Sequence, residues 1–169
     1  MGRFSAKAVR AVALGAAAVV ALTIVPSSVA TADRSPVARV RDATRAFHDV
    51  SRAEAAGYVR FLDCMDDGVS KGMGQHYVKP ELLQDGGALK ATQPEALVYD
   101  ESSGRARLVA VEYVVPGAPT DPAPHLLGRR FTYLPSLGVW KLHFWIWRDN
   151  PDGIFKDFNP RVPLCATWM

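Results

Sequence analysis

Three residues carry the clearest chemistry in this sequence: His76, Glu112 and His143. Glu112 lies in the middle of an otherwise apolar run, and His143 lies between aromatic residues. Two imidazoles and one carboxylate form a common ligand set for divalent metal ions. If their strands are neighbours, the three side chains converge on one face of a sheet. The sequence therefore predicts a metal site, with His48 or His125 as a fourth ligand.

The same residues also have a structural interpretation. A buried carboxylate needs a partner, so Glu112 would pair with an arginine or lysine inside the sheet while each histidine forms its own hydrogen bond. No H-E-x-x-H or other compact ligand motif occurs in the chain. Glu112 and His143 would also suit an acid–base pair, but that role needs a cleft and shifted pKa values. The sequence favours a non-catalytic domain that binds a small ligand or a partner protein. The alternatives are a metal-binding protein or metalloenzyme that uses these three residues, and a structural cell-envelope module without a pocket.

A second prediction is a pocket for a small ligand, which a curved sheet covered by a helix often holds. Its candidate lining residues are aromatic or polar: His76, Tyr77, Glu112, Tyr113, His143, Trp145 and Trp147. Exposed tryptophan rings would suit a sugar, since an aromatic face packs well on an apolar ring. The alternative is that these aromatic residues form part of the packed core.

The first 32 residues indicate export. Three basic residues precede an apolar run over 11–25, and the small residues Ala30-Thr31-Ala32 follow it. This order is typical of a secretory signal peptide cleaved after Ala32, or after Ala30 as the second choice. The apolar run is shorter than the roughly 20 residues of a membrane-spanning helix. We expect residues 33–169 to be a single secreted domain without stable membrane insertion.

Cleavage would change the charge balance of the protein. The whole chain has 20 basic and 17 acidic residues, and the first 32 residues hold three of the basic ones and no acidic one. The remaining domain therefore carries 17 of each and has no net charge. Non-specific binding to nucleic acid needs a basic surface. We expect a small molecule or another protein as the partner, and no nucleic acid.

Cys64 and Cys165 are the two cysteines of the chain. In an oxidising compartment two thiols in one small domain usually pair. The bond would close a loop of roughly 100 residues, which the chain-entropy model values at on the order of 4 kcal/mol. The alternative is two free or metal-bound thiols, although their spacing matches no zinc ligand pattern. The sequence predicts the disulfide.

The elements that must position these side chains follow from hydrophobic periodicity. Apolar residues at helical spacing predict an amphipathic helix over 36–50. A second short helix follows over 52–56, unless one continuous helix ends at Gly57. Strands are predicted over 58–62, 76–78, 95–99, 105–115, 128–134 and 139–148, with a glycine-rich loop over 66–74. Strands joined as hairpins predict an α+β fold, with the N-terminal helix packed on a mostly antiparallel sheet of about four to six strands.

Side-chain alternation assigns faces to the two longest predicted strands. Leu108, Ala110, Glu112 and Val114 share one face of the first strand. In the second strand the core face is fully apolar and consists of Trp140, Leu142, Phe144 and Ile146. The opposite face consists of Lys141, His143, Trp145 and Trp147.

Several strings in the chain resemble a group of exported bacterial proteins that have no established activity. They are GMGQHYV over 72–78, PEALVY over 94–99, VEY over 111–113, LHFWIW over 142–147 with Asn150-Pro151 after it, and NPRV over 159–162. The resemblance covers most of the domain apart from 116–138. It implies export and assigns no chemical role to any residue.

Overall fold

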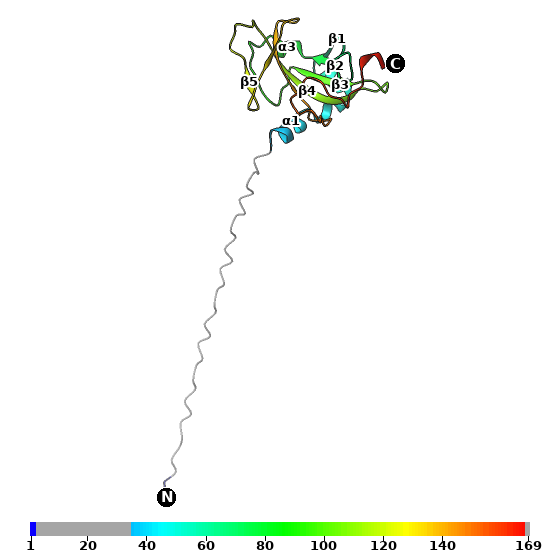
Figure 1. Ribbon diagram of the computed structural model, residues 1–169. Helices are drawn as coiled ribbons and strands as arrows, with labels where there is room; N and C mark the ends of the chain where they lie inside the picture. Colours follow the sequence, from blue (N-terminus) through cyan, green and yellow to red (C-terminus); the bar gives the residue numbers. More distant parts are fainter. Residues whose placement is uncertain (3–34, 168–169) are drawn as a thin grey trace. The chain divides into compact units, whose positions relative to one another are not determined.

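The computed structural model describes residues 1–2 and 35–167, so the predicted signal peptide lies outside the described residues apart from its first two. The described chain forms a six-stranded antiparallel sheet in the order β1-β2-β3-β4-β8-β7 (Figure 1). The predicted α+β class is thereby confirmed. Within this described part, no helix has the length and apolar character needed to cross a membrane.

The strands of the main sheet are joined mostly as neighbours along the chain. They are β1 (Val59–Asp66), β2 (Gly72–Val78), β3 (Ala96–Asp100), β4 (Arg107–Pro116), β7 (Thr132–Leu134) and β8 (Val139–Phe144). A separate two-stranded ribbon pairs β5 (His125–Leu126) with β6 (Arg129–Arg130). The long connection after β4 lets β8 pair with β4, and β7 then forms the far edge of the sheet.

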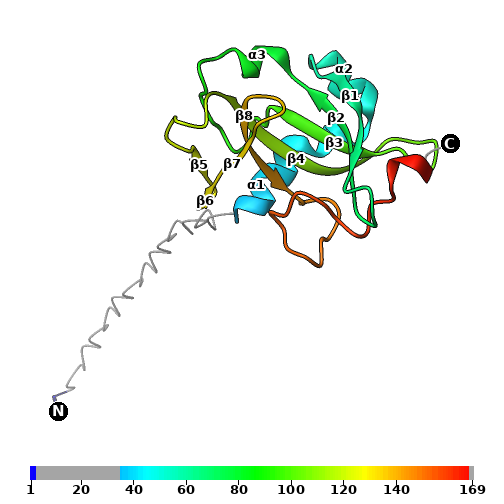
Figure 2. The same cartoon turned by 45° about the horizontal axis from the view of Figure 1, so that its top comes forward.

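The helical segments are short, and the predicted helix over 36–50 is divided. They are α1 (Pro36–Thr44), the 3-10 helix η1 (Arg45–His48), α2 (Val50–Ala55), α3 (Pro80–Leu83) and the 3-10 helix η2 (Cys165–Thr167). The break lies at Asp49, whose extended backbone and side-chain bond to the Ser51 amide start a new helix. Figure 2 shows α1 behind the main sheet.

The two faces of the sheet bury different residues. On the helix side, a large cluster includes Val40 of α1 with Leu97, Val111 and Tyr113 of the central strands. The predicted core face of the 139–148 segment also lies in this cluster and is confirmed. The opposite face has a smaller cluster around Trp145, which packs under the C-terminal segment. Because side chains alternate along a strand, residues such as His76 and Glu112 belong to this opposite face.

Two irregularities change the predicted faces. The pairing of β3 with β4 shifts between Val98 and Tyr99, which moves Leu108 into the helix-side cluster. β8 ends at Phe144, so the predicted strand is wrong over its last four residues. Trp147 then turns to the helix side, where its ring packs 4.3 Å from His48 between centroids. Trp145, by contrast, stays on the opposite face of the sheet, as predicted.

The glycine-rich loop predicted over 66–74 is wrong at its end, because Gly72–Gly74 form the start of β2. Gly74 has φ +114°, and a Cβ there would lie 2.6 Å from the carbonyl oxygen of Tyr99. Only glycine allows this backbone conformation together with so close an approach of β3. Gly74 is therefore needed for the close packing of β2 against β3.

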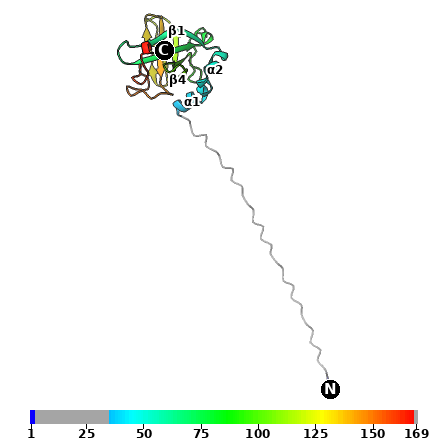
Figure 3. The same ribbon diagram turned by 90° about the vertical axis from the view of Figure 1, so that its right-hand side faces the viewer.

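The predicted disulfide between Cys64 and Cys165 is present, with its Cα atoms 5.7 Å apart. It joins β1 to η2, and Figure 3 shows η2, in red, beside β1. The Cys165 amide also donates a hydrogen bond of 2.7 Å to Asp66 Oδ2. The end of the described chain is thus held against the edge strand of the sheet.

Candidate metal centre

The residues His76, Glu112 and His143, here called the His–Glu–His group, come from β2, β4 and β8. Glu112 and His143 are direct partners across the β4–β8 ladder. β3 lies between β2 and β4, and it presents Ala96 and Val98 at the neighbouring positions. These side chains are small, so the imidazole of His76 reaches across β3 to the carboxylate.

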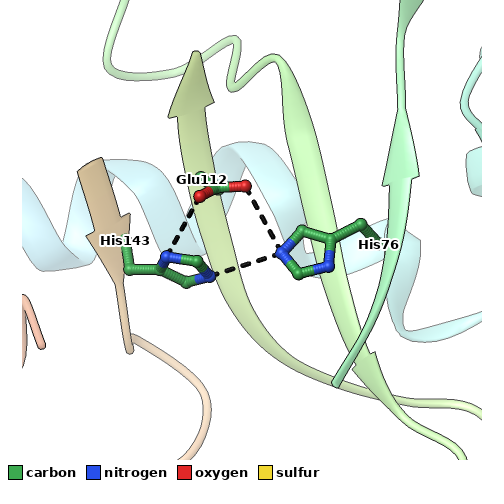
Figure 4. A group of neighbouring side chains, drawn as sticks. All are labelled: His76, Glu112 and His143. Carbon is green, nitrogen blue, oxygen red and sulfur yellow. Dashed lines mark hydrogen bonds and ion pairs between the residues drawn. The ribbon is translucent and has the colours of Figure 1, made fainter. Parts of the chain in front are cut away.

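The three side chains converge, as the sequence predicted (Figure 4). His76 Nε2 lies 3.3 Å from Glu112 Oε2 and 3.4 Å from His143 Nε2. His143 Nδ1 lies 3.1 Å from Glu112 Oε1. Only 2% of the His76 side chain, 8% of the Glu112 side chain and none of the His143 side chain is exposed. The His–Glu–His group is therefore a buried polar cluster.

The hydrogen bonding of this cluster is incomplete. Among the described residues, His76 Nδ1 is buried without a partner, whereas His143 Nδ1 contacts Glu112 Oε1. The two Nε2 atoms face each other, so at most one of them carries the hydrogen between them. Buried polar atoms in proteins are normally paired. The facing Nε2 atoms thus provide at least one lone pair at the centre of the group, and His76 Nδ1 stays unpaired.

The spacing of the donor atoms suits a metal ion. Zinc binds imidazole nitrogen at about 2.0–2.1 Å and carboxylate oxygen at about 2.0–2.2 Å, which separates tetrahedral ligand atoms by about 3.3–3.4 Å. The separations of 3.3 and 3.4 Å from His76 Nε2 match these values. Among the described residues the ion-pair partners of Glu112 are the two histidines, and no arginine or lysine takes that place. The group could therefore hold a divalent ion.

The electrostatics of the site keep the carboxylate charged. Burial by itself raises the pKa of Glu112. Attraction to His143, together with hydrogen bonds and attraction from His76, outweighs this effect and holds the pKa well below its usual value. Glu112 is thus ionised, which is the form in which a carboxylate can bind a metal ion.

The predicted fourth ligands lie elsewhere. His48 packs on Trp147 at the helix side of the sheet, and burial lowers its pKa. His125 is exposed in β5. Among the described residues, only the His–Glu–His group brings three potential ligands together. Neither histidine therefore belongs to the group: His48 lies on the other face of the sheet, and His125 lies in the separate β5–β6 ribbon.

A cavity of about 130 Å³ lies beside the group on the same face of the sheet. Its polar lining consists of His76, Glu112 and Lys141. The rest is apolar and comes from β1, β2, α3, β4 and the β7–β8 hairpin: Phe61, Met65, Val78, Leu83, Val114, Pro116, Leu134, Leu137, Val139. Phe61 and Leu137 are 37% and 40% exposed, so part of the cavity wall lies at the surface. Of the His–Glu–His group, His76 and Glu112 line this cavity.

The aromatic residues predicted to line a ligand pocket do not lie together around one cavity. Tyr77 and Tyr113 lie in the helix-side cluster, and their hydroxyls donate hydrogen bonds to Glu101 Oε1 and to the Ala91 carbonyl. Trp147 packs against the same cluster. Of the candidate lining residues, His76 and Glu112 line the cavity. The aromatic side chains belong to the core, which was the alternative interpretation.

Trp145 has a supporting position beside the site. Its ring stacks on the His143 imidazole with centroids 5.9 Å apart and an angle of 18° between the planes. Its Nε1 donates a hydrogen bond of 2.5 Å to the carbonyl of Lys156. These contacts fix the orientation of the imidazole ring, which a metal ligand requires.

Two charged residues of the site were not predicted. Lys141 is 7% exposed in its side chain, and its Nζ lies 2.5 Å from Asp157 Oδ1. The same oxygen lies 3.8 Å from His143 Nδ1. Lys141 shares a strand face with His143, so alternation could have identified it. Asp157 comes from an irregular segment that carries no periodic pattern.

Glu95, a second buried carboxyl group, gives a testable pH dependence. Burial raises its pKa from about 4.5 to about 7, although its Oε2 accepts a hydrogen bond from the Val114 amide. The folded state therefore holds this proton more tightly than the unfolded chain does. The resulting stability is complete below about pH 4.5 and is lost as the pH rises through about 7.

We expect Glu95→Gln to be more stable than the parent protein by about 1–3 kcal/mol above pH 7. The amide keeps an oxygen for the Val114 amide and has no proton to lose. Urea unfolding between pH 4 and pH 8 measures the difference, which should grow with pH and level off above 7. A difference that is the same at all pH values would contradict this assignment.

The chain matches no protein-family model, no curated protein and no solved structure. The resemblance of its strings to exported bacterial proteins stays a prediction. The function must therefore be inferred from the His–Glu–His group and from the cavity beside it.

Proposed function

We propose that this protein binds one divalent transition-metal ion through His76, Glu112 and His143. The observation that carries the proposal is the buried convergence of three side chains from three strands, with His76 Nε2 3.3 Å from Glu112 Oε2 and 3.4 Å from His143 Nε2. The two facing Nε2 atoms support it, because at most one of them carries a hydrogen and an ion would use the lone pairs of both.

The donor set favours particular ions. Two nitrogens and one carboxylate suit zinc and ferrous iron, whereas calcium and magnesium prefer sites made only of oxygen atoms. Structural zinc sites normally have four protein ligands, and sites that bind a further molecule have three. With three ligands beside an apolar cavity, the centre belongs to the second type. We therefore propose a role in binding a small molecule at the metal ion.

The protein is also proposed to work outside the cytoplasm. The signal-peptide pattern of residues 1–32 and the Cys64–Cys165 disulfide both support export, because disulfides persist in oxidising compartments. The balanced charge of the remaining chain supports a partner other than nucleic acid. A small molecule is the partner that the cavity favours.

Metal binding can be tested on protein purified through its export route without a histidine tag. Elemental analysis and zinc titration against a chromophoric chelator should give one equivalent with a Kd below about 1 µM. His76→Gln should weaken zinc binding strongly, whereas His125→Gln, a matched change at an exposed histidine, should leave it unchanged. Circular dichroism checks that both variants fold.

Two results would overturn the proposal. One is less than about a tenth of an equivalent of metal in the purified protein together with no saturable zinc binding. The other is a folded His76→Gln variant that binds zinc as tightly as the parent chain, because the ion would then bind elsewhere.

A further inference from the structure

The volume and the apolar lining of the cavity limit the size and polarity of a molecule that could bind in it. The walls are formed by aliphatic and aromatic side chains such as Phe61, Val78, Val114 and Val139. The volume is about 130 Å³. In another protein, an apolar cavity of about 150 Å³ takes up benzene. A six-carbon ring or a branched chain of similar size therefore fits here.

Lys141 supplies unused hydrogen-bond donors at the polar end of the cavity. Its ammonium group lies 2.5 Å from Asp157 Oδ1. Apart from this ion pair, the described residues provide no hydrogen-bond partner for the buried Nζ. An ammonium group has three hydrogens to donate. A ligand with acceptor oxygens at this end would satisfy them.

The charges at this end indicate which head group is accepted. Glu112 and Asp157 are negative and Lys141 is positive, so these three side chains together carry one net negative charge. A divalent ion in the His–Glu–His group changes this to one net positive charge. A buried charge needs a counter-charge. A singly charged anion therefore matches the metal-loaded site, and it would be repelled from the metal-free site.

Lys141 lies close to the His–Glu–His group. Asp157 Oδ1 lies 2.5 Å from Lys141 Nζ and 3.8 Å from His143 Nδ1, so the ammonium is no more than about 6.3 Å from that nitrogen of the imidazole. A carboxylate has two oxygens, so one can accept a hydrogen bond from the ammonium while the other points toward the His–Glu–His group. An alcohol has one oxygen and no charge, so it could contact either the ammonium or the metal ion but not both.

We propose that the cavity binds a small monocarboxylic acid with a compact apolar body, such as an aromatic or branched acid. One carboxylate oxygen binds the metal ion, the other accepts a hydrogen bond from Lys141 Nζ, and the apolar body fills the cavity. This inference rests on the proposed metal function. No covalent change is involved, and the metal and the acid bind reversibly.

The test uses the full exported chain loaded with cobalt(II), whose visible spectrum responds to a new ligand on the metal. Benzoate is the probe, acetate lacks the apolar body, and benzyl alcohol lacks the charge. We expect benzoate to change the cobalt spectrum at a concentration at least 10-fold lower than either control. We also expect no benzoate binding to the metal-free protein.

Variants separate the two parts of the site. Lys141→Met should weaken benzoate binding about 10-fold or more without weakening cobalt binding, since the change removes a positive charge beside the metal group. Lys71→Met is the matched control, because Lys71 forms an exposed pair with Asp152 at 2.6 Å. Val114→Phe should fill the cavity and prevent benzoate binding while the metal still binds. Thermal melting of each variant in a chelator shows whether it folds.

Each outcome decides a different point. Cobalt binding without a benzoate effect would overturn the ligand inference and leave the proposed metal function intact. Equal benzoate binding with and without metal would overturn the charge argument, and with it this inference. Failure to bind any cobalt or zinc would overturn both proposals.

Discussion

Replacing Glu112 by glutamine is expected to lower zinc affinity by more than about 100-fold while the protein stays folded. Changes to groups that only support a metal ligand already cost about 10–100-fold, and Glu112 is the anionic ligand itself. The amide has nearly the same shape and retains polar contacts to the two imidazoles. Its neutral oxygen is a much weaker ligand than a carboxylate. Competition with a chromophoric chelator measures the affinity.

Glu95→Gln is the matched control for this substitution, since Glu95 is another buried glutamate but lies outside the His–Glu–His group. It should bind zinc as the parent chain does. Unfolding of both variants in excess chelator separates metal affinity from stability. A folded Glu112→Gln variant with unchanged zinc affinity would show that the carboxylate is not a ligand.

Removing the disulfide is expected to have the largest effect on stability. The bond joins Cys64 to Cys165 across 101 residues. A loop of this length corresponds to about 3–5 kcal/mol, because the cross-link restricts the unfolded chain. The double variant Cys64→Ser/Cys165→Ser should therefore unfold at a much lower urea concentration. Equilibrium unfolding by urea, followed by tryptophan fluorescence, measures the change.

The parent protein in excess reductant is the control and should unfold at the same urea concentration as the double variant. The proposed metal ligands lie on β2, β4 and β8, whereas the disulfide joins β1 to η2. Zinc affinity of the variant should therefore stay within about 10-fold of the parent while it is folded. A loss of stability below about 1 kcal/mol would mean that packing alone holds the C-terminal segment.

Some site features followed from local rules. The placement of Glu112 and His143 on strand faces could be predicted, because side-chain direction alternates in any strand. The disulfide could be predicted because the chain has two cysteines and an export pattern. The core face of β8 was predicted correctly for the same reason as the site residues. These features can be predicted without knowing which strands are neighbours in the sheet.

Other features depended on strand order. His76 reaches Glu112 because β3 lies between their strands and presents Ala96 and Val98 there. No sequence pattern states which strands pair, since any two apolar strands offer similar edges. Trp147 was placed on the wrong face because β8 ends at Phe144, where the chain turns to pair with other segments. Such endings are set by tertiary contacts.

The sequence by itself determined the α+β class, the chemistry of the His–Glu–His group and the partner of each cysteine. Those properties depend on residue type and on the alternation of side chains along a strand. Only the tertiary structure decided that the three ligands meet, that Lys141 and Asp157 join them, and that a cavity opens beside them. A cavity wall collects residues from distant elements, and their approach is a property of packing that no local pattern records.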